Sequence, residues 1–154
     1  MSAPQSTTEI SLAKLTPSDR ELAGALFALM AQIFEESSEP LNSRYLDHLL
    51  GRDDFWVFAA LVDSQPVAGL TAFVVPLTRA RTSELLIYDL AVKPAYQRRG
   101  IGRRLVEAAN ALAARHGFES TWVPVAGEED HALEFYRAIG GRPSAATIFT
   151  FRRQ

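Results

Sequence analysis

The sequence predicts an α+β fold with a mixed, mostly antiparallel central sheet flanked by helices. Residues 55–62 and 67–75 are rich in aromatic and branched apolar residues, and the short turn Asp63-Ser64-Gln65-Pro66 between them predicts an antiparallel hairpin. Residues 84–92 and 120–125 read as two further strands, separated by a segment whose apolar residues recur at helical spacing. This second pair predicts one βαβ crossover.

The N-terminal third predicts one short strand and two helices. Residues 1–8 are polar and are expected to form a flexible tail, with residues 9–154 as one domain. Residues 9–12 are the candidate first strand. Thr16 suits a helix N-cap and Pro17 the first helical position. The helix that follows has apolar residues at helical spacing, namely Leu22, Leu26, Leu29, Met30 and Ile33, and a second helix is expected between Asn42 and Gly51.

The later elements follow from the same signals. Pro76 ends the returning strand of the hairpin, and residues 78–83 read as a loop. The crossover helix buries one face, made of Leu105, Val106, Ala109, Leu112 and Ala113, and Gly117 is its expected C-terminal cap. Residues 131–138 predict a short helix, and residues 148–151 predict a closing strand.

Composition and charge exclude several classes of function. The 154 residues carry a formal net charge of -2, which gives no general attraction for nucleic acid. The absence of cysteine excludes disulfides, thiolate metal sites and cysteine catalysis, and His48, His116 and His131 are too scattered to predict a metal site. No signal peptide or membrane-spanning run is recognisable, so the expectation is a soluble cytoplasmic protein.

The most specific segment is residues 97–102, Gln-Arg-Arg-Gly-Ile-Gly, between a predicted strand end and a predicted helix start. Backbone N–H groups converge at a helix start, the helix dipole adds positive potential, and glycines allow a diphosphate to approach closely. Four arginines add charge around this point: Arg98, Arg99, Arg103 and Arg104. A Walker loop is excluded because no Gly-Lys-Ser/Thr ends the segment. A Rossmann fingerprint is excluded because its third glycine is missing. The segment predicts another kind of diphosphate site, and the alternative is an ordinary glycine turn before a solvated basic helix.

The segment resembles the acetyl-CoA pyrophosphate loop of the GNAT superfamily of N-acetyltransferases. Residues 89–94, Asp-Leu-Ala-Val-Lys-Pro, resemble the strand end that precedes this loop in the family. Residues 132–140, Ala-Leu-Glu-Phe-Tyr-Arg-Ala-Ile-Gly, resemble the family's second signature helix. The resemblance runs from about residue 22 to the C-terminus and implies a GNAT fold with splayed central strands. Pro124 fits an opening sheet because proline cannot donate a ladder hydrogen bond, although a plain strand end explains it almost as well.

The resemblance implies acetyl-CoA as cofactor, a single acetyltransferase domain over residues 9–154, and two groups of cofactor-binding residues. The main chain of Leu90, Ala91 and Val92 would hydrogen-bond the pantetheine arm as an additional strand would. The loop and the helix start would bind the pyrophosphate, through Gln97, Arg98, Arg99, Gly100, Ile101, Gly102 and Arg103.

Acetyl transfer from a thioester to an amine needs a proton acceptor for the amine and an acid for the departing thiolate. The resemblance places the thiolate's proton donor at Tyr136, for which aromatic packing is the alternative. Asp89 is the candidate base or amine-orienting residue, because a carboxylate near the opening of the sheet is costly unless a cation faces it. Its alternative is an ion pair with an arginine, and the residues leave open whether a side chain or water takes the proton.

Acidic residues that the cofactor does not need predict a polycationic acceptor. They follow the first helix and precede the Tyr136 helix, where the resemblance implies that the acceptor cleft lies. The candidate substrate-binding residues are Glu35, Glu36, Glu84, Tyr88, Asp89, Glu128, Glu129 and Asp130. For each acidic residue the alternative is a structural role, either as a solvated acid in a loop or as an acid that stabilises a helix dipole.

Within the superfamily, several stretches resemble aminoglycoside 3-N-acetyltransferases of the GNAT type. The best-matching points are residues 87–92, Ile-Tyr-Asp-Leu-Ala-Val, and Pro76. The resemblance implies acetylation of the 3-amino group of the 2-deoxystreptamine ring, and hence antibiotic resistance. His131 stands where proline is expected, and the loop 37–42 does not match well.

Other functions remain as alternatives at this point. The acceptor can be another amine, such as a polyamine, a protein lysine or a chain N-terminus, or the chain can be a non-catalytic acetyl-CoA-binding module. Nucleic acid and membrane are not expected partners. The apolar segment 148–151 leaves a homodimer open.

Overall fold

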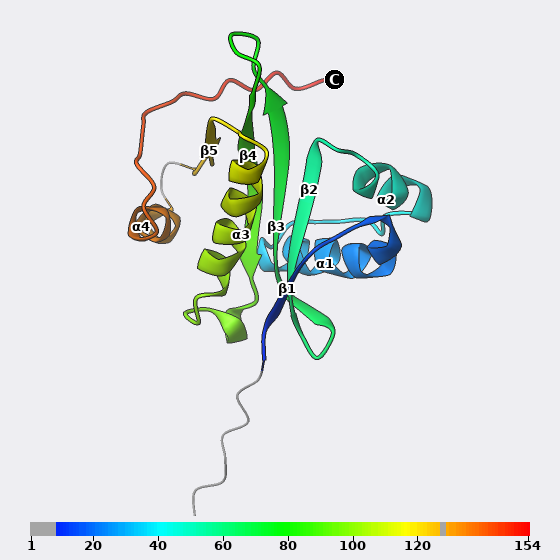
Figure 1. Cartoon of the computed structure of the whole chain (residues 1–154). Helices are drawn as coiled ribbons and strands as arrows, with labels where there is room; N and C mark the ends of the chain where they lie inside the picture. The colour runs from blue at the N-terminus through cyan, green and yellow to red at the C-terminus, as the bar shows by residue number, and fades with distance from the viewer. Residues whose placement is uncertain (1–8, 127–128) are drawn as a thin grey trace, which may run out of the picture. The chain divides into compact units, whose positions relative to one another are not determined.

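The computed structural model describes residues 9–126 and 129–154 (Figure 1). It divides the chain into two compact units, one ending at Pro124 and the other beginning at Val125. The first unit contains the sheet and three α-helices, and the second contains one helix and the C-terminal segment. The predicted tail 1–8 and the predicted substrate residue Glu128 lie outside the described residues. The prediction of one domain over residues 9–154 stays a prediction.

The first unit is built on a five-stranded sheet in the order β1-β2-β3-β4-β5 (Figure 1). Its strands are β1 (Ser11–Lys14), β2 (Phe55–Val62), β3 (Gln65–Pro76), β4 (Ser83–Val92) and β5 (Ser120–Trp122). Neighbouring strands are antiparallel except β4 and β5, which are parallel. The mostly antiparallel sheet with one βαβ crossover is therefore confirmed.

Three helices of the first unit start and end where local chemistry predicts. The helix α1 (Arg20–Ile33) follows a short 3-10 turn, in which the Thr16 N–H donates to the Asp19 carboxylate at 2.8 Å. The helix α2 (Ser43–Leu50) begins after Asn42, whose side chain accepts from the Tyr45 N–H at 2.9 Å. The helix α3 (Ile101–Arg115) ends before Gly117, which has φ +73°, a left-handed conformation that suits glycine.

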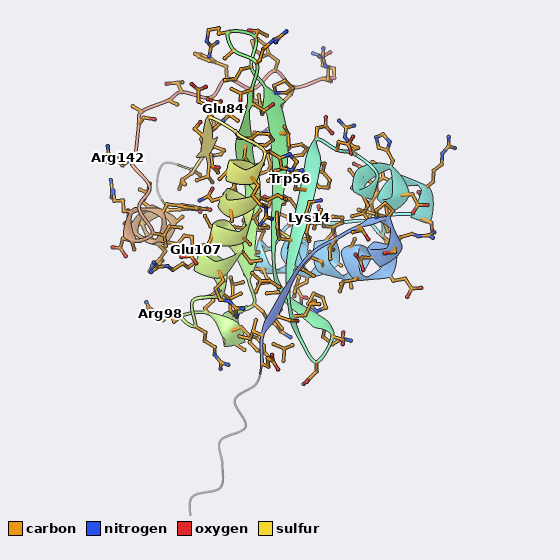
Figure 2. All side chains as sticks on the ribbon, viewed as in Figure 1. Lys14, Trp56, Glu84, Arg98, Glu107 and Arg142 are labelled. Carbon is orange, nitrogen blue, oxygen red and sulfur yellow. The ribbon has the colours of Figure 1, made fainter. Side chains whose placement is uncertain are left out.

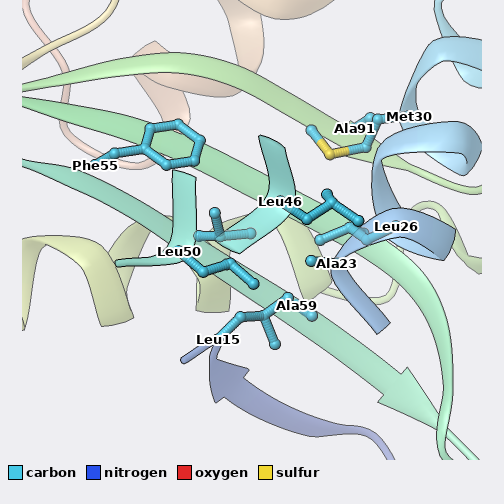
Figure 3. Packing of buried hydrophobic residues seen from close by; sticks show 10 residues of the cluster. Leu15, Ala23, Leu26, Met30, Leu46, Leu50, Phe55, Ala59 and Ala91 are labelled. Carbon is cyan, nitrogen blue, oxygen red and sulfur yellow. The ribbon is translucent and has the colours of Figure 1, made fainter. Parts of the chain in front are cut away.

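The core has two sides, because successive side chains of a strand point to opposite faces of the sheet. Figure 1 shows α3 in front of the sheet and α1 behind it. Figure 3 shows the cluster on the α1 side of the sheet, where Leu26 and Met30 of α1 and Leu46 and Leu50 of α2 pack. Gly69 permits this close approach, since a Cβ there would lie only 2.6 Å from the Leu26 Cδ1 atom.

The second unit contains α4 (Asp130–Ala138), which confirms the helix predicted at 131–138. The prediction of a closing strand at residues 148–151 is wrong, because residues 141–154 have no regular structure. Two smaller differences are that β1 begins two residues later than predicted and that β5 ends at Trp122 instead of residue 125. Apolar alternation indicates that a segment suits a strand, but a strand also requires a neighbour for its backbone groups.

Candidate active site

A β-bulge in β4 places two candidate residues on the same face of the sheet. The register between β3 and β4 shifts where Asp89 pairs with Thr71 and Ile87 pairs with Ala72, so Tyr88 is the extra residue. The rings of Tyr88 and Phe73 meet edge-on, with their centroids 5.6 Å apart. Phe73 in turn packs against the cluster of α1 and α2. Asp89 lies opposite Thr71, which shares the face of Phe73. Without the bulge Asp89 would point to the α3 side, because a one-residue slip reverses every following side chain.

The far edge of β4 is open beyond this bulge. Among residues 9–126 and 129–154, the strand that pairs with this side of β4 is β5, which pairs with Glu84, Leu85 and Leu86 and reaches no further along β4. The Lys93 N–H donates to the Val67 carbonyl of β3 at 2.8 Å. Because the backbone groups of successive strand residues point to opposite edges, this bond fixes the edge to which each preceding residue of β4 turns its own groups. The main chain of Ala91 then faces β3, whereas that of Leu90 and Val92 faces the open edge. Two of the three predicted pantetheine-binding residues, Leu90 and Val92, therefore direct backbone groups to this edge.

The loop 97–100 and the start of α3 form a cradle of backbone N–H groups. Arg98 and Gly100 adopt left-handed φ values of +61° and +76°, a conformation that lets successive N–H groups converge. The first helical bond runs from the Arg104 N–H to the Gly100 carbonyl at 3.0 Å. The N–H groups of Ile101, Gly102 and Arg103 precede that bond and have no carbonyl of their own helix to bind. A Cβ at Gly100 would meet no atom within 4 Å, so the approach to the cradle is open.

The four arginines of this segment have different surroundings. Arg104 donates to the Ile10 carbonyl at 3.2 and 3.3 Å, which ties the chain before β1 to α3. Arg103 forms an ion pair with Glu107 at 2.8 Å. The Arg99 guanidinium lies over the Tyr96 ring at 5.2 Å, and Figure 2 shows Arg98 on the loop below α3. The structure therefore gives Arg104 an architectural role that the charge pattern did not predict.

Gln97 links the cradle to the open edge of β4. Its side-chain amide donates to the Val92 carbonyl at 3.0 Å, one of the backbone groups that face the open edge. The glutamine thus holds the end of the strand and the start of the loop in a fixed relation. The sequence could indicate Gln97 only by its position in the motif, because its partner is a backbone carbonyl.

The carboxylates of Asp89 and Glu36 lie close enough to interact. Partial burial raises the pKa of Asp89, and the negative charge of Glu36 raises it further. The arginine ion pair considered for Asp89 is not among the ion pairs of the described residues. A half-buried carboxylate within electrostatic range of a second carboxylate favours binding of a cation nearby.

Glu36 owes its position to the way α1 ends. The Glu35 N–H donates to the Gln32 carbonyl at 3.1 Å and the Glu36 N–H to the Ala31 carbonyl at 3.0 Å. Glu35 takes the left-handed conformation, φ +55°, that glycine usually supplies at this point of a helix. This reversal turns the chain so that Glu36 comes within the electrostatic range of Asp89.

Of the other predicted acidic residues, Glu84 is not brought together with Asp89. Glu84 accepts a hydrogen bond from Ser120 at 3.2 Å, and Figure 2 shows it near β5, at the other end of β4 from the cradle. Five residues of extended chain, roughly 15 Å, separate it from Asp89. Glu129 and Asp130 are exposed residues at the start of α4 in the second unit. Their predicted role stays a prediction.

Tyr136 lies on α4 in the second unit. Its ring meets that of Phe135 edge-on, with the ring centroids 5.0 Å apart. Its backbone carbonyl accepts a hydrogen bond from the Gly141 N–H at 2.8 Å. Burial raises the pKa of the Tyr136 hydroxyl to about 12, so it carries its proton at every ordinary assay pH. A protonated phenol of this kind can donate a hydrogen bond to an anion.

The described residues contain neither a candidate metal site nor a membrane-spanning helix. No group of three or more His, Asp or Glu side chains among residues 9–126 and 129–154 could hold a metal ion. No helix in that part of the chain combines the length and the apolar character that crossing a membrane requires.

The comparison with protein families matches residues 23–140 to the acetyltransferase (GNAT) family. Among curated proteins, the chain is 30% identical over 64 residues to the [ribosomal protein bS18]-alanine N-acetyltransferase of Escherichia coli (strain K12). That alignment spans 42% of this chain and 43% of the relative's length.

Solved structures match over nearly the whole chain. An aminoglycoside acetyltransferase, meta-AAC0020, from an uncultured soil metagenomic sample in complex with sisomicin is 29% identical, with a TM-score of 0.88 and coverage of 94% of this chain and 96% of that one. A second soil metagenomic aminoglycoside acetyltransferase, HMB0005, is 28% identical, with a TM-score of 0.86 and coverage of 94% and 99%. Aminoglycoside N-acetyltransferase AAC(6')-Iy in complex with CoA is 15% identical, with a TM-score of 0.81 and coverage of 99% of both chains, and shares the fold.

Proposed function

We propose that this chain, which belongs to the acetyltransferase (GNAT) family, transfers an acetyl group to the 3-amino group of the 2-deoxystreptamine ring of aminoglycoside antibiotics. The acetyl donor of the family is acetyl-CoA. The observation that carries the choice of acceptor is the half-buried Asp89, whose pKa is raised by burial and by the negative charge of Glu36. The two soil aminoglycoside acetyltransferases at 28–29% identity support the same class of acceptor.

The residues of the first unit fit the donor. A diphosphate matches the cradle, where helix-start N–H groups converge beside an open glycine. The backbone groups of Leu90 and the Val92 N–H on the open edge of β4 suit an amide-containing arm, which can pair with them as a strand would. The Val92 carbonyl already accepts from Gln97. The bound donor supplies a thioester carbonyl that an amine can attack.

Asp89 and Glu36 would act on the acceptor. An aminoglycoside carries several ammonium groups, and a pair of carboxylates binds one of them while a neighbouring amine is positioned for attack. The raised pKa of Asp89 also makes its carboxylate a stronger base, which suits removal of a proton from the attacking amine. Tyr88, placed on the same face by the bulge, offers an exposed ring for the apolar face of a sugar.

Tyr136 would act on the departing sulfur. A thiol has an ordinary pKa of about 8.5, so a full proton transfer from a phenol with a pKa of about 12 would be uphill by about 3.5 pKa units. The proposal therefore assigns Tyr136 a hydrogen bond to the developing thiolate, with water completing the protonation.

A second candidate acceptor is the N-terminal amine of a protein. The partial identity with the Escherichia coli ribosomal-protein acetyltransferase favours it. A peptide acceptor needs only one amine to be recognised, so it gives no reason for the two neighbouring carboxylates of Asp89 and Glu36.

The test is thiol release from acetyl-CoA with gentamicin or sisomicin as acceptor. Asp89→Asn is expected to lower kcat by about 10²-fold or more through loss of the base. Glu36→Gln is expected to raise KM for the drug with a smaller change in kcat, because it only binds the cation. Asp47→Asn is the matched control, because it removes an exposed acid of α2 that pairs with Arg20 of α1. It is expected to leave both constants unchanged.

The position of transfer requires the product. Two-dimensional NMR of acetylated gentamicin is expected to show the new amide on the 3-nitrogen of the 2-deoxystreptamine ring. An amide on the 6'-nitrogen would keep the enzyme class and refute the position. Acetyl-CoA binding without thiol release from either drug would refute the acceptor class, and polyamines and peptides with an N-terminal alanine would then be the substrates to test.

A further inference from the structure

Arg104 stands at a position where a cation by itself is unfavourable. It lies in the first turn of α3, where the positive end of the helix dipole repels a positive charge. Its guanidinium donates through Nη1 and Nη2 to the Ile10 carbonyl, at 3.3 and 3.2 Å. Both terminal nitrogens thus converge on one backbone oxygen. Arg104 therefore has a fixed partner, which a freely solvated arginine would not have.

The Ile10 carbonyl is a firm anchor, because the chain enters the sheet directly after it. Ser11, the first residue of β1, pairs with Leu61 of β2. β1 forms one end of the strand order and β5 the other. Figure 1 shows the chain that leads into β1 at the end of the sheet where α3 starts. The Arg104 hydrogen bonds therefore tie the start of α3 to the β1 edge, across 94 positions of the sequence.

The turn that is tied in this way carries the cradle. The Arg104 N–H closes the first helical bond with the Gly100 carbonyl at 3.0 Å, and the N–H groups of Ile101, Gly102 and Arg103 precede it. The first turn of a helix frays easily, because it fixes several residues for a single hydrogen bond. Ile101 is 2% exposed, so it holds the turn to the sheet on the buried face. The exposed Arg104 holds the same turn from its other face.

Gln97 holds the cradle from its other side. Its amide donates to the Val92 carbonyl of β4 at 3.0 Å. Gln97 and Arg104 thus flank the N–H groups of the cradle, and each is bonded to a backbone carbonyl next to or within a strand. Groups that are held in place before a ligand arrives bind it with a smaller entropic cost of ordering. The two bonds together therefore favour a preformed anion site.

We propose that Arg104 is a positioning residue for acetyl-CoA, which holds the first turn of α3 through the Ile10 carbonyl so that its N–H groups converge before the diphosphate binds. The inference rests on the binding of the diphosphate at the cradle. It assigns Arg104 a positioning role in place of the direct phosphate contact that its charge suggests. The two roles can be separated, because a phosphate ligand acts only when a phosphate is present.

The first experiment measures amide hydrogen exchange by NMR in the free protein, for the unaltered chain and for Arg104→Met. Methionine keeps a long unbranched side chain but cannot donate a hydrogen bond. The amides of residues 105 and 106 bond back to the cradle residues Ile101 and Gly102, so they report on the first turn. They are expected to exchange about three- to tenfold faster in the variant. Arg115→Met removes the same charge at the other end of α3 and is expected to leave these amides unchanged.

The second experiment measures the Kd for acetyl-CoA by isothermal titration calorimetry. Arg104→Met is expected to raise Kd about tenfold, as the loss of a hydrogen bond from a charged donor implies. Arg104→Lys, whose ammonium can still donate to the Ile10 carbonyl, is expected to keep Kd within about twofold. Arg115→Met is again the control and is expected to bind acetyl-CoA as the unaltered chain does.

Three results would overturn the proposal, each for a different reason. A higher Kd for Arg104→Met with unchanged exchange at residues 105 and 106 would show that Arg104 contacts the phosphate directly. An unchanged Kd for Arg104→Met, in a protein whose Gly100→Ala variant binds acetyl-CoA more weakly, would leave the cradle in place and refute only the role of Arg104. An unchanged Kd in both variants would refute the cradle itself and this role with it.

Discussion

Replacing Gly100 with alanine separates two roles of one glycine, because the chain carries a matched control at the other end of the same helix. Gly100 has φ +76° before α3, and Gly117 has φ +73° after it. At both positions a new Cβ would meet no atom within 4 Å, so neither substitution creates a clash. The two variants therefore differ only in what approaches the new methyl group.

The loss of stability is expected to be the same for both variants. An alanine in the left-handed region costs about 1–2 kcal/mol relative to glycine. For a chain of this size that corresponds to a decrease in Tm of about 2–8 °C. Differential scanning calorimetry of Gly100→Ala and Gly117→Ala measures this shared term.

Acetyl-CoA affinity is expected to fall only for Gly100→Ala. The methyl group would stand in the open approach to the cradle and keep the diphosphate from one or two of its N–H groups. Each charge-assisted hydrogen bond contributes about 1.5–3 kcal/mol, so losing one raises Kd about ten- to a hundredfold. Isothermal titration calorimetry with acetyl-CoA measures the change, and Gly117→Ala is expected to bind as the unaltered chain does.

Two results would refute this reasoning. An unchanged Kd for Gly100→Ala would mean that the diphosphate does not bind at this loop. An equal loss of affinity in both variants would mean that strain in α3, and not access to the cradle, controls binding.

Three further predictions concern Asp89, Tyr136 and Gly69. Because the folded-state pKa of Asp89 is raised, the native state loses stability as pH rises through that pKa, and Asp89→Asn is expected to raise Tm at pH 7. In thermal scans across pH, this gain should shrink as the pH falls toward the ordinary Asp value of about 4, and a gain that is constant with pH would contradict the assignment. Tyr136→Phe is expected to lower kcat, and the alkaline side of the kcat profile of the unaltered enzyme should show no ionisation of Tyr136 below about pH 11, given its pKa of about 12. Gly69→Ala is expected to destabilise the protein by about 1–3 kcal/mol in urea unfolding, because the new Cβ would lie 2.6 Å from the Leu26 Cδ1 atom. In the double variant with Leu26→Ala the clash is removed, so the loss of unfolding free energy should be smaller than the sum of the losses in the two single variants. A loss equal to that sum would contradict the clash.

Much of the fold was predictable because its signals are local. Thr16 and Asn42 mark helix starts by their capping chemistry, and Gly117 marks a helix end by its backbone freedom. The cradle was equally predictable, since its backbone N–H groups depend on a helix start and on Gly100, both of which are visible in the sequence.

The sequence could name the acidic residues but could not choose among them. Glu36 and Asp89 are 53 positions apart, and Glu84 is far closer to Asp89 along the chain, yet Glu36 is the one whose charge acts on Asp89. The choice depends on the β4 bulge at Tyr88 and on the left-handed Glu35, neither of which follows from residue type. The segment 148–151 failed as a predicted strand for a related reason, because alternation carries no information about the partner.

The sequence by itself predicted the kind of site, since a helix start with Gly100 and neighbouring arginines favours an anion through short-range backbone geometry. It also determined the order of helices and strands, except at the C-terminus. Only the tertiary structure decided which face Asp89 occupies, which carboxylate acts on its pKa, and which backbone groups of β4 point to the open edge. These features depend on strand register and on contacts between distant segments, and such long-range pairings leave no periodic trace in the chain.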